Sequence, residues 1–201
     1  MKTQNLTALA LAAAAAPGLA IAHPGHGADH PGTFLDGLLH PLSGADHLLA
    51  MVAIGLWAAQ MAQGRGRGPA LALPATFLAS LLGGAVAARA GFVLPVVEPV
   101  ILASVIVLGG LIAAAVRMPM GAALGMVALF GAAHGAAHAI EGPESGMAIY
   151  VAGFVAMTAA LHAAGLVLGL AGARLTRFLG AGTAVAGATS VLAGVVFGLQ
   201  I

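Results

Sequence analysis

The sequence predicts an all-α membrane protein with six transmembrane helices, preceded by a cleavable signal peptide. Of its residues, 61% are apolar and 6% are charged, whereas soluble domains carry about 25% charged residues. The mean hydropathy is +1.05. Because about 20 apolar residues cross a bilayer as a helix, the chain of 201 residues holds about six spans and no separate soluble domain.

The first apolar run is predicted to be the signal peptide, residues 1–22. Lys2 precedes an apolar run over residues 6–19, and residues 20–22 read Ala-Ile-Ala. A basic start, a short apolar run and a small-residue cleavage site are typical of secretory signals. An uncleaved first helix is the alternative. Cleavage would leave the mature N-terminus in the periplasm and the protein in the inner membrane of a bacterium.

The mature chain is predicted to have two parts, a His-rich periplasmic N-terminus (residues 23–32) and a six-helix transmembrane domain (residues 33–201). Gly, Pro and charged residues coincide at most breaks between the apolar runs, as they do in loops. The six predicted spans are Thr33–Met61, Pro69–Arg89, Val96–Val116, Met118–Ile140, Met147–Ala171 and Thr176–Leu199.

The arginines predict how these spans are oriented. With the N-terminus outside, five arginines fall in cytoplasmic loops and Arg89 falls outside, which is the positive-inside bias of membrane proteins. Three spans in each half would make the two halves inverted in the membrane, with the first and fourth spans as partners. The five cytoplasmic arginines are Arg65, Arg67, Arg117, Arg174 and Arg177.

The octapeptide HPLSGADH, from His40 to His47, carries the first functional signal. An ionisable side chain in a membrane costs about 3 kcal/mol, so such residues usually mark a pathway or a binding site. Pro41 should kink or open the helix between the two histidines, and a residue before proline is itself biased away from helix. Asp46 should point toward a neighbouring helix or support His47. In a continuous helix, the shared face would consist of Asp36, His40, Ser43 and His47.

Three more histidines lie in later spans. His134 and His138 are one turn apart in the fourth span and share a face with Glu141, and two histidines at this spacing can clamp a metal ion. His162 lies near the middle of the fifth span; taken alone, it could equally be a hydrogen-bonding residue between helices. Together, the polar groups are predicted to form a funnel from the outer surface toward the membrane centre.

The donor types predict a transition-metal site. The chain has no cysteine, and imidazoles with carboxylates suit Ni²⁺, Co²⁺, Zn²⁺ or Cu²⁺. A carboxylate such as Asp46 can fix the tautomer of a histidine ligand. In the Gly- and Pro-rich N-terminus, His23, His26 and His30 indicate a metal collector. The formal charge of +1 gives no reason to expect nucleic-acid binding.

The octapeptide resembles the HPxxGxDH signature of the HupE/UreJ family of nickel and cobalt permeases. The segment FGAAHGAAHAIE, with its paired histidines, and the order of signal peptide, His-rich start and signature also resemble that family. The resemblance implies uptake of Ni²⁺ or Co²⁺, with metal-delivery proteins of hydrogenase or urease maturation as partners. The metal-handling residues that it implies are His40, Asp46, His47, His134 and His138.

The predicted mechanism is secondary or facilitated transport without a prosthetic group. No GxxxxGK[ST] loop is present to bind a nucleotide phosphate. The ion should pass from the N-terminal histidines through an outer group of residues to a deeper one. The outer group is Asp36, His40 and His138; the deeper group is Asp46, His47, His134 and His162.

Two other functions fit the same residues. A zinc-dependent intramembrane hydrolase would hold its metal with three histidines and activate water with an acid. Against it, the HGAAH segment lacks the Glu that follows the first histidine in HExxH proteases. A membrane protein that binds metal without transporting it is the second alternative.

Overall fold

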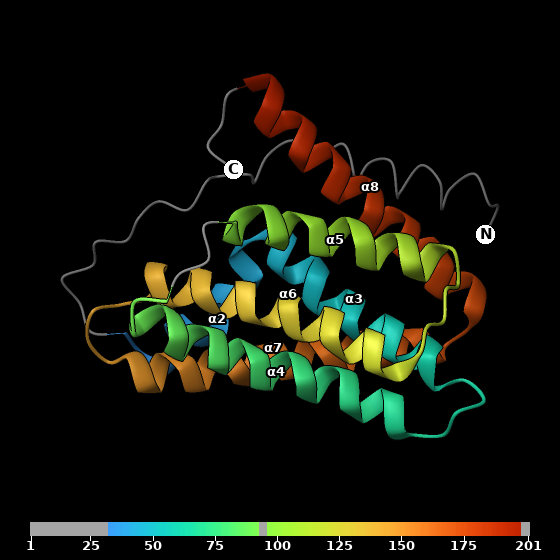
Figure 1. Cartoon of the computed structure of the whole chain (residues 1–201), viewed down its shortest axis with the longest axis horizontal. Coiled ribbons are helices and arrows are strands. Elements are labelled where there is room, and N and C mark those ends of the chain that lie inside the picture. The colour runs from blue at the N-terminus through green and yellow to red at the C-terminus, as the bar shows by residue number, and fades with distance from the viewer. Residues whose placement is uncertain (1–31, 93–95, 198–201) are drawn as a thin grey trace.

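The computed structural model describes residues 32–92 and 96–197, and all regular structure in these two ranges is helical. The predicted signal peptide and the three N-terminal histidines lie outside these ranges. The helices are α2 (Phe34–Ser43), α3 (Ala45–Ala62), α4 (Gly68–Arg89), α5 (Val97–Ala113), α6 (Met120–Glu141), α7 (Met147–Leu170) and α8 (Ala173–Phe197). They form one bundle, from which the end of α8 leans away (Figure 1).

Five of the six predicted spans, the second to the sixth, begin and end within three residues of a helix in the structure. Four helices, α3, α4, α6 and α7, are long and apolar enough to cross a membrane. α5 is also apolar but has 17 residues, and α8 carries Arg174 and Arg177 near its start. Apolar helices of membrane length are therefore confirmed in the described ranges, whereas a total of six spans stays a prediction.

The first predicted span, Thr33–Met61, is built from two helices with a break between them. α2 ends at Ser43, Gly44 takes an extended conformation (φ −107°, ψ 126°), and α3 starts at Ala45. The break lies between the two histidines of the octapeptide, as predicted.

The position of the break depends on a glycine rather than on the proline. Pro41 lies inside α2 and His40 stays helical, so the predicted departure of His40 from helix is wrong. A Cβ atom at Gly44 would lie 2.8 Å from Asp46 Oδ1 and 3.1 Å from His47 Nδ1. The side chains of these two residues fold back over the glycine, and a residue without Cβ leaves them room.

Three pairs of helices build the bundle: α3 packs against α7, α4 against α6 and α5 against α8, while α2 lies along α7. Glycines bring the paired backbones close together, as small residues do in membranes. A side chain at Gly55 in α3 would collide with the backbone of α7 at His162. A side chain at Gly131 in α6 would collide with the backbone of α4 at Phe77.

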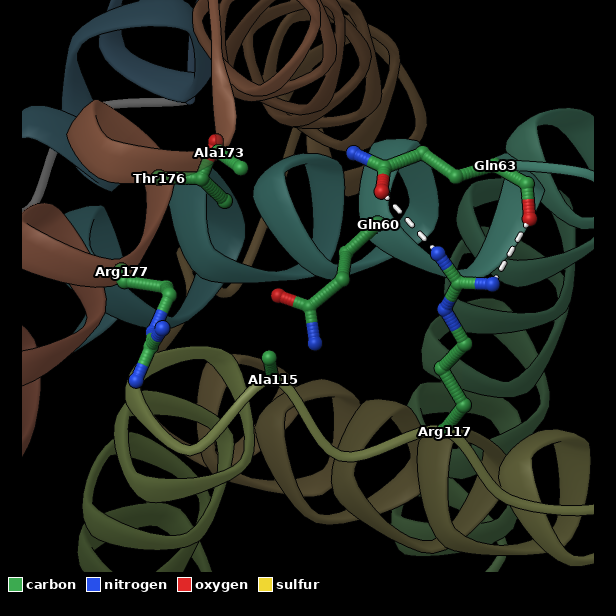
Figure 2. Close-up of a pocket in the computed structure, with 7 residues that line it drawn as sticks. All are labelled: Gln60, Gln63, Ala115, Arg117, Ala173, Thr176 and Arg177. Carbon is green, nitrogen blue, oxygen red and sulfur yellow. Dashed lines mark hydrogen bonds between the residues drawn. The ribbon is translucent and has the colours of Figure 1, made fainter.

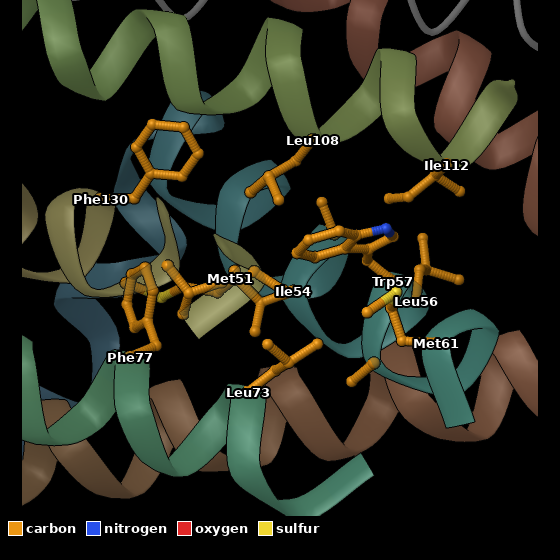
Figure 3. Close-up of a cluster of buried hydrophobic side chains, with 14 of the residues drawn as sticks. Met51, Ile54, Leu56, Trp57, Met61, Leu73, Phe77, Leu108, Ile112 and Phe130 are labelled. Carbon is orange, nitrogen blue, oxygen red and sulfur yellow. The ribbon is translucent and has the colours of Figure 1, made fainter. Parts of the chain in front are cut away.

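The bundle has two chemically different ends. The histidine end comprises α2, the start of α3 and the end of α6; the arginine end comprises the end of α3, the α5–α6 link and the start of α8. Buried apolar side chains fill the space between them (Figure 3). The largest include Met51, Ile54 and Trp57 of α3, Phe77 of α4, Leu108 and Ile112 of α5, and Phe130 of α6.

Candidate metal site

Five histidines from four helices gather at the histidine end. Their rings touch in sequence: the ring centroids of His40 and His138 are 4.8 Å apart, those of His138 and His47 4.5 Å, and those of His47 and His134 5.1 Å. His162 adjoins this group through Phe77. We call these five residues the histidine cluster. All but His40 are between 0% and 5% exposed.

His47 is held by the carboxylate of the preceding residue. Its Nδ1 lies 2.8 Å from Asp46 Oδ1, and the same oxygen accepts the backbone N–H of His47 at 2.9 Å. An ionised carboxylate can only accept, so Nδ1 carries the proton and Nε2 holds the lone pair. This is the arrangement by which a carboxylate orients a histidine that ligates a metal.

His134 and His162 are oriented in the same way by backbone carbonyls. His134 Nδ1 donates to the carbonyl of Phe130 at 2.8 Å, and His162 Nδ1 donates to the carbonyl of Met51 at 2.7 Å. Both Nε2 atoms are buried and have no hydrogen-bond partner among the described residues. A buried acceptor without a donor costs about 1–3 kcal/mol, and a metal ion is a ligand that would satisfy such a lone pair.

His40 and His138 form the outer part of the cluster. His40 Nε2 lies 3.1 Å from His138 Nδ1, so one of the two rings donates a proton to the other. Two aromatic residues of α7 flank the pair: Phe154 lies 4.3 Å from His138, and Tyr150 lies 5.8 Å from His40, between ring centroids. The second histidine of the HGAAH segment therefore links the two histidines of the octapeptide.

Not every predicted residue joins the cluster. Asp36 is exposed and accepts from the backbone N–H and hydroxyl of Thr33, which makes it part of the helix cap of α2. Ser43 donates to the carbonyl of His40 instead of pointing with it toward His47. The predicted shared face is therefore wrong, because the break at Gly44 separates the two helices.

Other predicted residues lie where the structure gives no side-chain placement. Glu141 is the last residue of α6, and its side chain is outside the described part, as are the N-terminal histidines His23, His26 and His30. Their metal-binding roles stay predictions.

The cluster is not a closed coordination shell. Among the described residues, no three His, Cys, Asp or Glu side chains lie close enough together to hold a metal ion as they stand. The rings of neighbouring histidines are nevertheless in contact with one another. The arrangement gathers nitrogen donors without closing a coordination shell around one point.

Sequence reasoning missed the apolar surroundings of the cluster and its backbone acceptors. Phe77, Tyr150 and Phe154 carry no signal of a site in the sequence, because aromatic residues in apolar helices read as core. The bond from His134 to the carbonyl four residues earlier follows from helical spacing. The bond from His162 to Met51 joins two helices and needed the structure.

The arginine end is tied by hydrogen bonds from guanidinium groups. Arg117 donates to the backbone oxygen and to the side-chain oxygen of Gln63, at 2.9 and 3.0 Å (Figure 2). Arg65 donates to the carbonyl of Met118 at 3.1 Å. A cavity of about 120 Å³ lies beside these contacts. Its lining is Gln60, Gln63, Ala115, Arg117, Ala173, Thr176 and Arg177.

Comparison with known proteins places the chain in a family. It matches the family described as "HupE / UreJ protein" over residues 9–197. A curated relative, "Protein HupE" of Rhizobium leguminosarum bv. viciae, is 42% identical over 194 residues, which cover 94% of this chain and 97% of the relative. No solved structure matches the chain significantly. The chain therefore belongs to the HupE/UreJ family.

Proposed function

We propose that the protein is a secondary or facilitated transporter that imports Ni²⁺ or Co²⁺ from the periplasm to the cytoplasm through the histidine cluster. Family membership supports this proposal, because the sequence resemblance associates the HupE/UreJ family with nickel and cobalt permeases. The four apolar helices of membrane length support a location in the membrane.

One observation carries the proposal: His47, His134 and His162 each have Nδ1 bound to an oxygen that can only accept. In this tautomer Nε2 carries the lone pair, and the Nε2 atoms of His134 and His162 have no hydrogen-bond partner among the described residues. Neutral imidazole nitrogens suit Ni²⁺ and Co²⁺, and an oriented ring binds a metal more tightly than a free one. Asp46 would offset part of the charge of the ion.

The proposed route has three stages. The N-terminal histidines His23, His26 and His30 would collect the ion. His40 and His138 would receive it at the exposed side of the cluster. The buried residues would then hold it, first Asp46, His47 and His134 and afterwards His162. Asp36, whose carboxylate caps α2, and Glu141 are outside this binding group in our proposal and would act at most on the approach of the ion.

The packing of the helices supports two inverted halves. The first half contains α3, α4 and α5, and the second contains α6, α7 and α8 in the equivalent places. If each helix is replaced by its equivalent, the α3–α7 pair becomes the α6–α4 pair and the α5–α8 pair stays the same pair. The contacts follow the same exchange, since Gly55 of α3 faces the His162 backbone and Gly131 of α6 faces the Phe77 backbone. Relative movement of the two pairs would then open the histidine cluster to one side or the other.

Release toward the arginine end requires such a movement. His47 and Gln60 stand at opposite ends of α3, about 20 Å apart at 1.5 Å per residue. Between them lie the apolar side chains of Figure 3, and no described Asp, Glu, Lys or Arg side chain is buried among them. The arginine end would be cytoplasmic by the positive-inside rule.

Uptake of radioactive Ni²⁺ into sealed right-side-out membrane vesicles tests the proposal. We expect accumulation with the unaltered protein and loss of at least about tenfold in His47→Ala and His134→Ala. Thr183→Val is the matched control: Thr183 is a buried polar residue of α8 that bonds only the carbonyl of Leu179 in its own helix.

Two outcomes would contradict the proposal. Uptake that is unchanged in both histidine variants would remove the cluster from the route. Tight binding of Ni²⁺ to purified protein without accumulation in vesicles would identify a metal-binding protein that does not transport. Competition of Co²⁺ and Zn²⁺ with labelled Ni²⁺ in the same vesicles would establish which ion the site prefers.

A further inference from the structure

The ring of Phe77, in α4, contacts the rings of both His134 and His162. Its ring centroid lies 5.5 Å from that of His134 and 5.1 Å from that of His162, the second contact being edge-on with an interplanar angle of 89°. The side chain is fully buried. Within the described part of the chain, both rings contact Phe77 and no ring contact joins His134 directly to His162.

Each imidazole that contacts Phe77 has one nitrogen without a partner. The Nε2 atoms of His134 and His162 are buried and have no hydrogen-bond partner among the described residues. Their Nδ1 atoms are anchored on carbonyls, which restricts rotation of the imidazoles. A phenyl ring has no donor for these lone pairs. Among the described residues, neither imidazole belongs to a group of three side chains that could hold a metal ion as they stand.

The backbone of Phe77 cannot retreat easily. Gly131 of α6 lies against it so closely that a Cβ atom there would be 2.6 Å from the Phe77 carbonyl oxygen. α4 and α6 are a closely packed pair, and close packing transmits rather than absorbs displacement. The mobile part is therefore the phenyl ring itself, which rotates about its side-chain bonds on a faster timescale than helices move.

The position of Phe77 is also central. Phe77 and His162 are equivalent residues of the two halves, because the Phe77 backbone packs against Gly131 and the His162 backbone packs against Gly55. The two equivalent side chains, one phenyl and one imidazole, then touch each other. The ring therefore stands where the α4–α6 pair meets the α3–α7 pair.

We propose that Phe77 separates two binding positions within the histidine cluster, a first position at His47 and His134 and a second position at His162. The ion passes from the first position to the second only when the phenyl ring swings aside. This inference rests on the proposed transport function. Phe77 is a gating and positioning residue that binds no ion itself; it keeps the two positions from merging into one tight site.

A double-mutant cycle in Ni²⁺ affinity tests this role. Equilibrium dialysis of detergent-purified protein against Ni²⁺ compares wild type, Phe77→Ala, His162→Ala and the double variant. Wild type and His162→Ala should have Ni²⁺ dissociation constants within about twofold of each other. Phe77→Ala should bind Ni²⁺ about tenfold more tightly than wild type, because the imidazole of His162 can then join the first position. That gain should vanish when His162→Ala is added.

Transport provides the second readout. In vesicles, Phe77→Ala should lower Ni²⁺ uptake about tenfold, because the ion is held more tightly, and His162→Ala should also lower uptake despite its unchanged affinity. Leu73→Ala is the matched control: Leu73 is fully buried one turn earlier in α4 and should change neither affinity nor its dependence on His162. Phe77→Leu keeps more side-chain volume and should give a smaller gain in Ni²⁺ affinity. It replaces Phe77→Ala in the cycle if that variant fails to fold.

The cycle separates this inference from the transport proposal. If wild type takes up Ni²⁺ but neither Phe77 variant binds Ni²⁺ more tightly, or if the gain persists without His162, the gating role is wrong and the transporter stands. If wild type takes up no Ni²⁺ in vesicles, the transport function is wrong, and the gating role falls with it.

Discussion

At the arginine end, guanidinium groups donate to carbonyls of neighbouring segments, as Arg65 does to Met118 and Arg117 to Gln63. At the histidine end, imidazoles also donate to carbonyls, but each donation leaves a second nitrogen whose lone pair points elsewhere. Arg65 and Arg117 thus find acceptors within the protein, whereas the histidine end keeps acceptors that a cation would satisfy.

The charges differ in the same sense. The described Asp and Glu residues all lie in segments at the histidine end, and five of the six arginines lie at the other. A cation is therefore attracted to the first end and repelled from the second. Under the proposed transport function, the histidine end would take up the ion, and the arginine end would have to open before the ion leaves.

The largest expected effect concerns the scaffold that holds the histidines. Gly135 lies between the two histidines of α6, and a side chain there would collide with the backbone oxygen of Leu81 in α4. Gly135→Leu should therefore force the α4–α6 pair apart and lower the free energy of unfolding by about 3 kcal/mol, measured by thermal unfolding in detergent.

Gly125 gives the matched control in the same helix. A Cβ atom there meets nothing within 4 Å, so Gly125→Leu should leave the unfolding temperature nearly unchanged. Equal destabilisation by the two substitutions would show that close packing of α4 on α6 does not position the histidine end.

The next effect concerns the carboxylate that orients His47. Asp46→Ala removes the acceptor at Nδ1, which frees the tautomer and the ring, and should weaken Ni²⁺ binding by about 10- to 100-fold. Isothermal titration of purified protein measures this. Asp36→Ala is the control, because it removes an exposed carboxylate of α2 that caps a helix; its Ni²⁺ affinity should match wild type. Equal loss in both variants would point to net charge rather than to orientation of His47.

The smallest effect is expected at the arginine end. Arg117→Ala removes two hydrogen bonds to Gln63 and should loosen the contact between the end of α3 and the α5–α6 link. Ni²⁺ should then leave preloaded vesicles about fivefold faster, with no change in Ni²⁺ affinity. Arg67→Ala is the control, since the exposed Arg67 side chain makes no hydrogen bond or ion pair within the described part of the chain. A changed affinity in Arg117→Ala would mean that the two ends are not independent.

Much of the fold follows from local sequence properties. The apolar runs and the Gly, Pro and Arg residues between them predict both ends of five helices to within three residues. This works because a long apolar segment in a membrane nearly always forms a helix. The first span could not be placed in this way. Pro41 was the expected break, but the break occurs at Gly44, where the space required by the Asp46 and His47 side chains decides, and that requirement is tertiary.

The histidine cluster was predictable in membership but not in geometry. Residue chemistry pointed to His40, His47, His134, His138 and His162, all of which the structure brings together. Helical spacing then misplaced Asp36, because a face is shared only along an unbroken helix. The role proposed for Phe77 had no sequence signal at all, since its significance lies in which two rings it touches.

X-ray absorption spectroscopy of the Ni²⁺-loaded protein tests the central claim most directly. If imidazoles from α3 and α6 share one ion, the spectrum of the unaltered protein should show scattering from at least two imidazole rings, and His47→Ala and His134→Ala should each remove one. A spectrum with oxygen ligands alone, or one that neither substitution alters, would contradict the account.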